Sequence, residues 1–168
     1  MIQITDKTKC CGCRACSEIC PKQSISMKRD EEGFLYPVVD NKTCIDCSLC
    51  EKVCPELNVK DACEENWNTP KIFASYALDD ETRIDSTSGG LFSVLAENFF
   101  DAGAYVAGAV YDENFGLKGI VTKDRSLLPK IRSSKYLQSD PKHLYKEIKE
   151  LLTGGEKVFV CSTPCQIA

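Results

Sequence analysis

The chain has 168 residues, 12 cysteines and a formal charge of −4 at pH 7, and this length fits a small domain followed by a medium one. The acidic balance and the lack of a basic stripe argue against nucleic acid as a partner. No run approaches 18 consecutive apolar residues and residues 1–9 lack a signal core, so we expect a cytoplasmic protein without a membrane span. Because that compartment is reducing, the cysteines predict metal binding and not disulfides.

The first part of the chain contains an internal repeat of cysteines. Residues 10–21 are echoed by residues 44–55, and each run has the spacing C-x2-C-x2-C-x3-C-P. This is the run of bacterial ferredoxins that hold two 4Fe–4S clusters, in which the fourth cysteine of each run ligates the other cluster. Three cysteines on a tight loop can wrap one cluster, and the proline ends the turn after the fourth cysteine.

The spacing therefore predicts two sites with crossed ligands. We assign the first cluster to Cys10, Cys13, Cys16 and Cys54, and the second cluster to Cys44, Cys47, Cys50 and Cys20. Zinc held by paired C-x2-C units is the alternative, but it leaves the x3-C-P tails unexplained. Cys11 and Cys63 lie outside the spacing and are interpreted as plain thiols.

Between the two runs, Ile25–Met27 and Phe34–Val39 are short apolar stretches on either side of an acidic turn with Gly33, a pattern that predicts a β-hairpin. Residues 64–70 indicate a polar linker. We therefore predict two domains, a ferredoxin-type domain over residues 1–66 and a second domain over residues 67–168.

The second part alternates between strand and helix patterns. We predict a strand over Lys71–Leu78 and a helix over Leu91–Asp101 that begins after Thr87 or Ser88 as its N-cap. The apolar residues Leu91, Val94, Leu95 and Phe99 share one face of this helix. Gly103 ends it, and Tyr105–Tyr111 with Leu117–Thr122 then predict a hairpin.

Towards the end, Asp140 is interpreted as the cap of a helix from Pro141 to Leu152, followed by a buried strand over Lys157–Cys161. Thr163-Pro164 is a helix start with four residues after it, too few to form a helix. We therefore expect a missing C-terminal domain. His143, the sole histidine, is interpreted as a surface residue of the charged helix.

Three motifs carry a resemblance to a known family. Residues 86–93 (STSGGLFS), 134–139 (SKYLQS) and 162–168 (STPCQIA) resemble signatures of the coenzyme F-420 (deazaflavin) hydrogenase/dehydrogenase beta-subunit family. Glu32-Gly33-Phe34 also fits members with a ferredoxin-like module. The chain departs from the family at Cys161-Ser162, where a Ser-Gly pair is usual, and by its abrupt end.

The resemblance implies a flavoprotein subunit that holds FAD and iron–sulfur clusters and passes electrons to a two-electron carrier or substrate. The expected fold is α+β: a small ferredoxin-like domain followed by the N-terminal part of an α/β flavoprotein domain. The residues implied in flavin binding are Ser88, Gly89, Gly90, Lys135, Ser139 and Thr163. Read without the family, the Ser-Gly-Gly stretch is an ordinary helix start and Lys135 an ordinary surface lysine.

Cys165 is a further candidate metal ligand, because it follows a strand and lies at a helix N-terminus, where a thiol is more easily ionised. The alternative is a buried free cysteine. Cys161, inside the apolar strand, is interpreted as a core residue. The chain offers no pair of nucleophile and histidine, so its chemistry must come from cofactors.

Three functions remain open. The first is an iron–sulfur flavoprotein oxidoreductase subunit that exchanges electrons with a redox partner protein or a small two-electron substrate. The second is a ferredoxin-type electron carrier with an appended partner-binding domain and no flavin. The third is a structural metal-binding module, which would be colourless with zinc.

Overall fold

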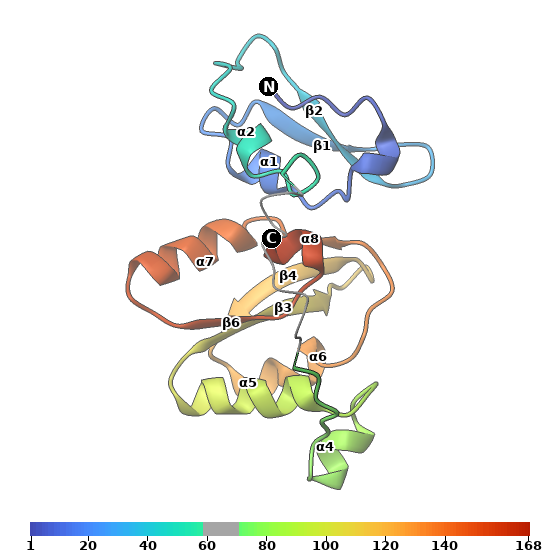
Figure 1. Cartoon of the computed structure of the whole chain (residues 1–168), viewed down its shortest axis with the longest axis vertical. Helices are drawn as coiled ribbons and strands as arrows, with labels where there is room; N and C mark the ends of the chain where they lie inside the picture. Colours follow the sequence, from blue (N-terminus) through green and yellow to red (C-terminus); the bar gives the residue numbers. More distant parts are fainter. Residues whose placement is uncertain (59–70) are drawn as a thin grey trace. The chain divides into compact units, whose positions relative to one another are not determined.

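The computed structural model describes residues 1–58 and 71–168 (Figure 1). Contacts divide the chain into two compact units, Met1–Glu65 with Thr163–Ala168, and Asn66–Ser162. The predicted domain boundary at 66/67, the linker over 64–70 and Cys63 lie outside the described residues. In the two described ranges, no helix is both long enough and apolar enough to cross a membrane.

The first unit contains the predicted hairpin. Strand β1 (Ile25–Arg29) pairs antiparallel with β2 (Leu35–Val39), which confirms the prediction. Asp30 closes the turn, because its carboxylate accepts the backbone N–H groups of Glu32 and Phe34 at 3.1 and 3.0 Å. Gly33 has a φ of +90°, which few residues other than glycine adopt.

Short helical turns complete this unit: η1 (Lys7–Lys9), α1 (Ala15–Glu18), α2 (Leu49–Lys52) and α8 (Pro164–Ile167). The expectation that no helix forms after Thr163 is wrong, because Thr163 is the N-cap and Pro164 the first residue of a single turn. The apolar core is built around cysteines and comprises Ile2, Cys16, Ile25, Cys50 and Cys54.

The second unit is built on a four-stranded mixed sheet with the order β5-β4-β3-β6. Strands β3 (Tyr105–Tyr111) and β4 (Leu117–Thr122) form the predicted antiparallel hairpin. Strand β6 (Val158–Val160) runs parallel to β3, and the two-residue β5 (Ser139–Asp140) runs parallel to β4.

Helices cover both faces of this sheet (Figure 1). Helices α5 (Leu91–Asp101) and α6 (Leu128–Ile131, after the turn η2, Arg125–Leu127) lie on one face, and α7 (Leu144–Thr153) lies on the other. Gly108 on β3 lies against Ile131, and Gly119 on β4 lies against Leu144. The core between α5, α6 and the sheet comprises Ala96, Phe100, Val106, Val110, Leu128 and Ile131.

Helix α5 has the predicted bounds, but its predicted face and cap are wrong. Leu91, Val94 and Leu95 are exposed, whereas the buried face carries Ser93, Ala96 and Phe100. Small side chains on that face let the helix approach the sheet closely. The N-cap is Gly90 with a φ of +77°, neither Thr87 nor Ser88.

Three further predictions are corrected. Residues 71–78 form no strand, and Ile72 and Leu78 are each 87% exposed. Helix α7 begins at Leu144 and not at Pro141, because Asp140 lies in β5 paired with Lys118 of β4 and the N-cap is His143, with a φ of 67°. Cys161 is exposed and lies just past the end of β6, so it is not a core residue.

A short helix, α4 (Asp80–Ile84), precedes α5 in the chain and is capped by Asp79, which accepts the Thr82 N–H at 2.7 Å. His143 is exposed, as predicted.

Candidate metal centre

The two cysteine runs fold into matching loops. In the first run, Gly12 and Arg14 have left-handed φ values of 63° and 65°, and in the second Asp46 and Ser48 have 51° and 58°. These positions correspond, since each pair flanks the second cysteine of its run. Left-handed residues turn neighbouring N–H groups to one side of a loop, an arrangement that favours anions such as thiolates. Arg14, Asp46 and Ser48 adopt this conformation without being glycine, which indicates a local constraint.

The first pocket gathers the cysteines that the spacing assigns to one cluster. Its empty volume is about 360 Å³, and its cysteine lining comprises Cys10, Cys13, Cys16 and Cys54, together with Cys11. Cys54 comes from the second run and the others come from the first. Apolar residues from the N-terminus, Ile2 and Ile4, complete the wall.

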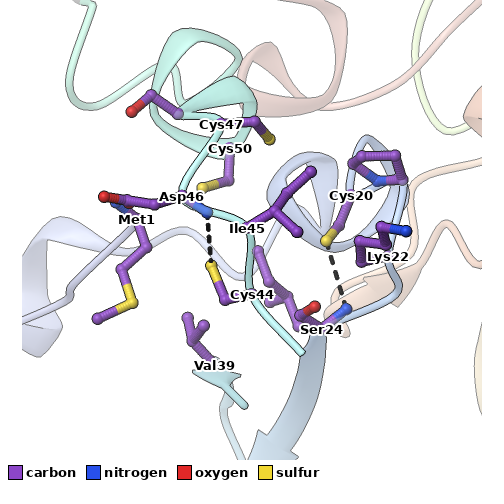
Figure 2. A pocket seen from close by; sticks show the side chains of 13 residues that line it. Met1, Cys20, Lys22, Ser24, Val39, Cys44, Ile45, Asp46, Cys47 and Cys50 are labelled. Carbon is purple, nitrogen blue, oxygen red and sulfur yellow. Dashed lines mark hydrogen bonds and ion pairs between the residues drawn. The ribbon is translucent and has the colours of Figure 1, made fainter. Parts of the chain in front are cut away.

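The second pocket gathers the other predicted set (Figure 2). Its empty volume is about 350 Å³, and its cysteine lining comprises Cys20, Cys44, Cys47 and Cys50. Here Cys20 comes from the first run. The N-terminal ammonium of Met1 stabilises the wall by pairing with Asp46 at 2.8 Å and with Glu51 at 3.2 Å. The structure thus brings together both predicted sets, while their role as ligands stays a prediction.

Backbone N–H groups point at the cysteine sulfurs. Ile2 donates to Cys50 Sγ at 3.3 Å, Ser24 donates to Cys20 Sγ at 3.3 Å, and Asp46 donates to Cys44 Sγ at 3.4 Å. Such bonds are characteristic of iron–sulfur sites, where hydrogen bonds to sulfur tune the reduction potential.

Burial and hydrogen bonds shift the pKa of individual pocket thiols in opposite directions. Burial raises the pKa of Cys16 to about 12, and the neighbouring Cys13 and Cys10 raise it further. Burial likewise raises the pKa of Cys13, with the charges of nearby cysteines adding to it. At Cys20 burial acts in the same direction, but the backbone N–H groups of Ser24 and Lys22, together with the Ser24 hydroxyl, outweigh it and lower the pKa.

These observations fit an iron–sulfur cluster in each pocket. Thiolates that converge repel one another, and a cationic core relieves that repulsion and holds the thiols deprotonated. In residues 1–58 and 71–168, no three His, Cys, Asp or Glu side chains gather tightly enough for a single metal ion. Four thiols spread around a hollow suit a cluster in which each iron takes one thiolate.

Cys11 lines the first pocket without belonging to its predicted ligand set, and Cys165 belongs to the same unit. Cys11 donates to Glu56 Oε1 at 3.2 Å, and burial, then that bond, then Cys165 raise the pKa of Cys11 to about 12. Cys165 Sγ lies 3.3 Å from Thr163 Oγ1 and lies outside the lining of the two pockets. Its role as a ligand stays a prediction.

Two of the residues implied in flavin binding, Gly89 and Gly90, have packing roles in the second unit. A Cβ at Gly89 would meet the Ser75 carbonyl oxygen at 2.9 Å, and one at Gly90 would meet Ala77 Cβ at 3.1 Å. Ala77 also donates its N–H to the Gly89 carbonyl at 2.6 Å. Both glycines are thus required by the close approach of residues 75–77, whatever else they bind. Ser88 beside them is exposed.

The first two family motifs meet in the structure. Ser134 donates its backbone N–H to Thr87 Oγ1 at 3.2 Å, and the two hydroxyls lie 3.3 Å apart. Lys135 Nζ donates to the carbonyls of residues 131, 132 and 133 at 2.9 to 3.1 Å and so caps the end of α6. Ser139 lies in β5 opposite Leu117. Thr163 belongs to the other unit.

Sequence reasoning missed two residues of the cluster pockets. Ile2 is 4% exposed and supplies an N–H to Cys50, which nothing in the cysteine spacing indicates. Ser24 is 2% exposed and lines the second pocket. Aligning the two runs would have marked its position, four residues after the last cysteine of the run.

Comparison with known proteins agrees with this geometry. The profile of a family described as "4Fe-4S dicluster domain" matches residues 9–58, which include both cysteine runs. A search of curated proteins found no match. Residues 9–58 therefore form a ferredoxin-type 4Fe–4S dicluster domain, and the chain has an iron–sulfur electron-transfer role.

Proposed function

We propose that the chain is the electron-transfer subunit of an iron–sulfur flavoprotein oxidoreductase, similar to the coenzyme F-420 hydrogenase/dehydrogenase beta-subunit family. The observation that carries the electron-transfer part is the pair of pockets, each with three cysteines from one run and one from the other. The clusters supply one-electron transfer. The chain's own residues position them and direct N–H groups at their ligands.

The crossed arrangement favours transfer between the two sites. Because each run contributes to both pockets, the two pockets share the same short segments and the same apolar core around Ile25. Such a core keeps the sites at a fixed separation, and its low polarity limits solvent rearrangement during transfer. Cysteine ligands of this kind persist in a reducing compartment, which supports a cytoplasmic location.

Support for a flavin comes from the second unit. Thr87 of the Ser-Thr-Ser-Gly-Gly motif and Ser134 of the Ser-Lys-Tyr motif are 47 residues apart, yet they are joined by hydrogen bonds. Helix α5 begins at Leu91, directly after the Ser-Thr-Ser-Gly-Gly motif, and the N-terminus of a helix favours anions such as the phosphates of FAD. A redox partner protein or a small two-electron substrate would then exchange electrons through the flavin.

A second candidate function has its own support. The ammonium of Lys135 donates to three carbonyls, and Gly89 is held by packing against Ser75 and Tyr76. If Lys135 and Gly89 serve only these structural roles and bind no flavin, the second unit serves to dock a partner, and the chain is a ferredoxin-type carrier without flavin.

Titration of FAD into the anaerobically reconstituted chain distinguishes the two functions. Flavin fluorescence should be quenched with saturation at one FAD per chain, and Lys135→Ala should weaken binding. Lys130→Ala is the matched control, because Lys130 is an exposed lysine of helix α6, whose end Lys135 caps. No saturable quenching by a protein with full iron content would contradict the flavin proposal and favour the carrier.

A further inference from the structure

Ser24 lies at the point where the first cysteine run passes into strand β1. It follows Cys20 by four residues and is buried, with 2% of its surface exposed. Its backbone N–H donates to Cys20 Sγ at 3.3 Å, and its carbonyl accepts the Asp40 N–H at 2.7 Å. Both backbone groups of Ser24 are therefore satisfied, which leaves the side-chain hydroxyl to account for.

That hydroxyl has no hydrogen-bond partner of standard geometry in the described part of the chain, although it lies close enough to Cys20 Sγ to contribute to the lowered pKa of that thiol. Buried hydroxyls in native proteins nearly always have a partner, so a buried hydroxyl without one calls for a ligand or an ion. Ser24 lines the pocket of Cys20, Cys44, Cys47 and Cys50, and Figure 2 shows it beside Cys20 at the edge of that pocket. A 4Fe–4S cluster in this pocket would offer the Ser24 hydroxyl sulfide and thiolate sulfurs as hydrogen-bond acceptors.

The other pocket has no such hydroxyl at the matching position. Four residues after Cys54, the last cysteine of the second run, stands Asn58. Its side-chain amide donates to the carbonyls of Glu51, Lys52 and Cys54 at 2.8, 3.1 and 2.8 Å. Those bonds turn the amide towards the backbone of its own turn. The two halves of the repeat therefore differ at this position, where one has a buried hydroxyl and the other an amide bonded to its own turn.

We propose that the Ser24 hydroxyl donates a hydrogen bond to a sulfur of the cluster held by Cys20, Cys44, Cys47 and Cys50, and thereby raises the reduction potential of that cluster. Reduction adds one negative charge to a cluster, and a donor directed at its sulfur stabilises the reduced state more than the oxidised state. Ser24 is thus a tuning residue that acts on one cluster and not on the other.

The inference rests on the cluster assignment of the proposed function and is independent of the flavin. Iron and sulfide content of the wild-type chain tests that assignment first and separately. Reduction potentials are then measured on fully loaded protein by redox titration followed by electron paramagnetic resonance. Cys13→Ser and Cys47→Ser, one from each pocket, show which signal belongs to which cluster.

In Ser24→Ala we expect the equilibrium constant for one-electron reduction of the second cluster to fall about tenfold, which corresponds to a reduction potential lower by about 59 mV. The first cluster should stay unchanged. Ser26→Ala is the matched control, since Ser26 is an exposed serine two residues further along β1. Ser24→Thr keeps the hydroxyl and should restore the potential to within about twofold of the wild-type equilibrium, or about 18 mV by the same constant.

An unchanged potential in fully loaded Ser24→Ala would overturn the proposal, and so would equal shifts in both clusters. A second measurement covers the case in which Ser24→Ala does not take up its cluster. Resonance Raman spectra of the wild-type protein in heavy water should show isotope shifts in the iron–sulfur modes of the second cluster larger than those of the first. Equal isotope shifts in the two clusters would also overturn the proposal.

Discussion

Replacing Cys54 by alanine tests the crossed ligation of the two clusters. Cys54 belongs to the second run, yet it lines the pocket of Cys10, Cys13 and Cys16. The substitution leaves that pocket with three of its four thiols, while the other pocket keeps all four. Iron should therefore fall from about eight atoms per chain to between about four, if the cluster is lost, and about seven, if one iron is lost.

The fold should survive this change. Cys54 is buried, with 9% of its surface exposed, but truncation removes one sulfur atom, much less than the Leu→Ala changes that cost roughly 2–5 kcal/mol. Iron and sulfide analysis, with electron paramagnetic resonance of the reduced protein, measures the outcome. Cys11→Ala is the control in the same pocket and should keep about eight iron atoms. Crossed ligation would be wrong if Cys54→Ala disturbed the signal that Cys47→Ser disturbs and spared the signal that Cys13→Ser disturbs.

Two predictions concern stability. The hydrogen bond from Lys7 to Asp30 holds the pKa of Asp30 below 3.8 in the folded protein. The stability that this carboxylate contributes is therefore complete above pH 3.8 and is lost as the pH falls through the lower pKa of the folded state. Acid unfolding of Asp30→Asn should begin at a higher pH than that of the wild type. Gly119→Ala places a Cβ 2.6 Å from Leu144 Cδ2 and should lower the free energy of unfolding by about 1–3 kcal/mol. In Gly154→Ala the nearest atom is 3.4 Å away, so denaturant unfolding should change by less than about 0.5 kcal/mol, and equal losses in the two glycine variants would contradict the packing argument.

The cysteine pockets were predictable because their geometry is local. A run of cysteines at short spacing fixes which thiols a loop can present together, and the proline after the fourth marks where the loop ends. Both predicted sets of four line separate pockets in the structure. The hairpins were predictable for a similar reason, since each pairs neighbouring segments across a short turn.

Predictions that depended on distant partners were less successful. Helix α5 turns Ser93 and Ala96 to the sheet and leaves Leu95 exposed, a choice set by how closely the helix approaches β3. An amphipathic pattern alone favours the larger apolar side chains. Residues 71–78 have a strand-like composition but pair with no strand, since Ala77 bonds to Gly89 instead. The Ser24 hydroxyl was likewise hidden, because its burial depends on the chain around the pocket.

Residues 9–58 match a 4Fe–4S dicluster domain and should therefore hold two 4Fe–4S clusters. Metal and sulfide analysis of the anaerobically reconstituted chain measures this. We expect about eight iron and eight sulfide per chain, with the broad brown absorption of iron–sulfur proteins. Stoichiometric zinc without sulfide, in a colourless protein, would contradict this expectation.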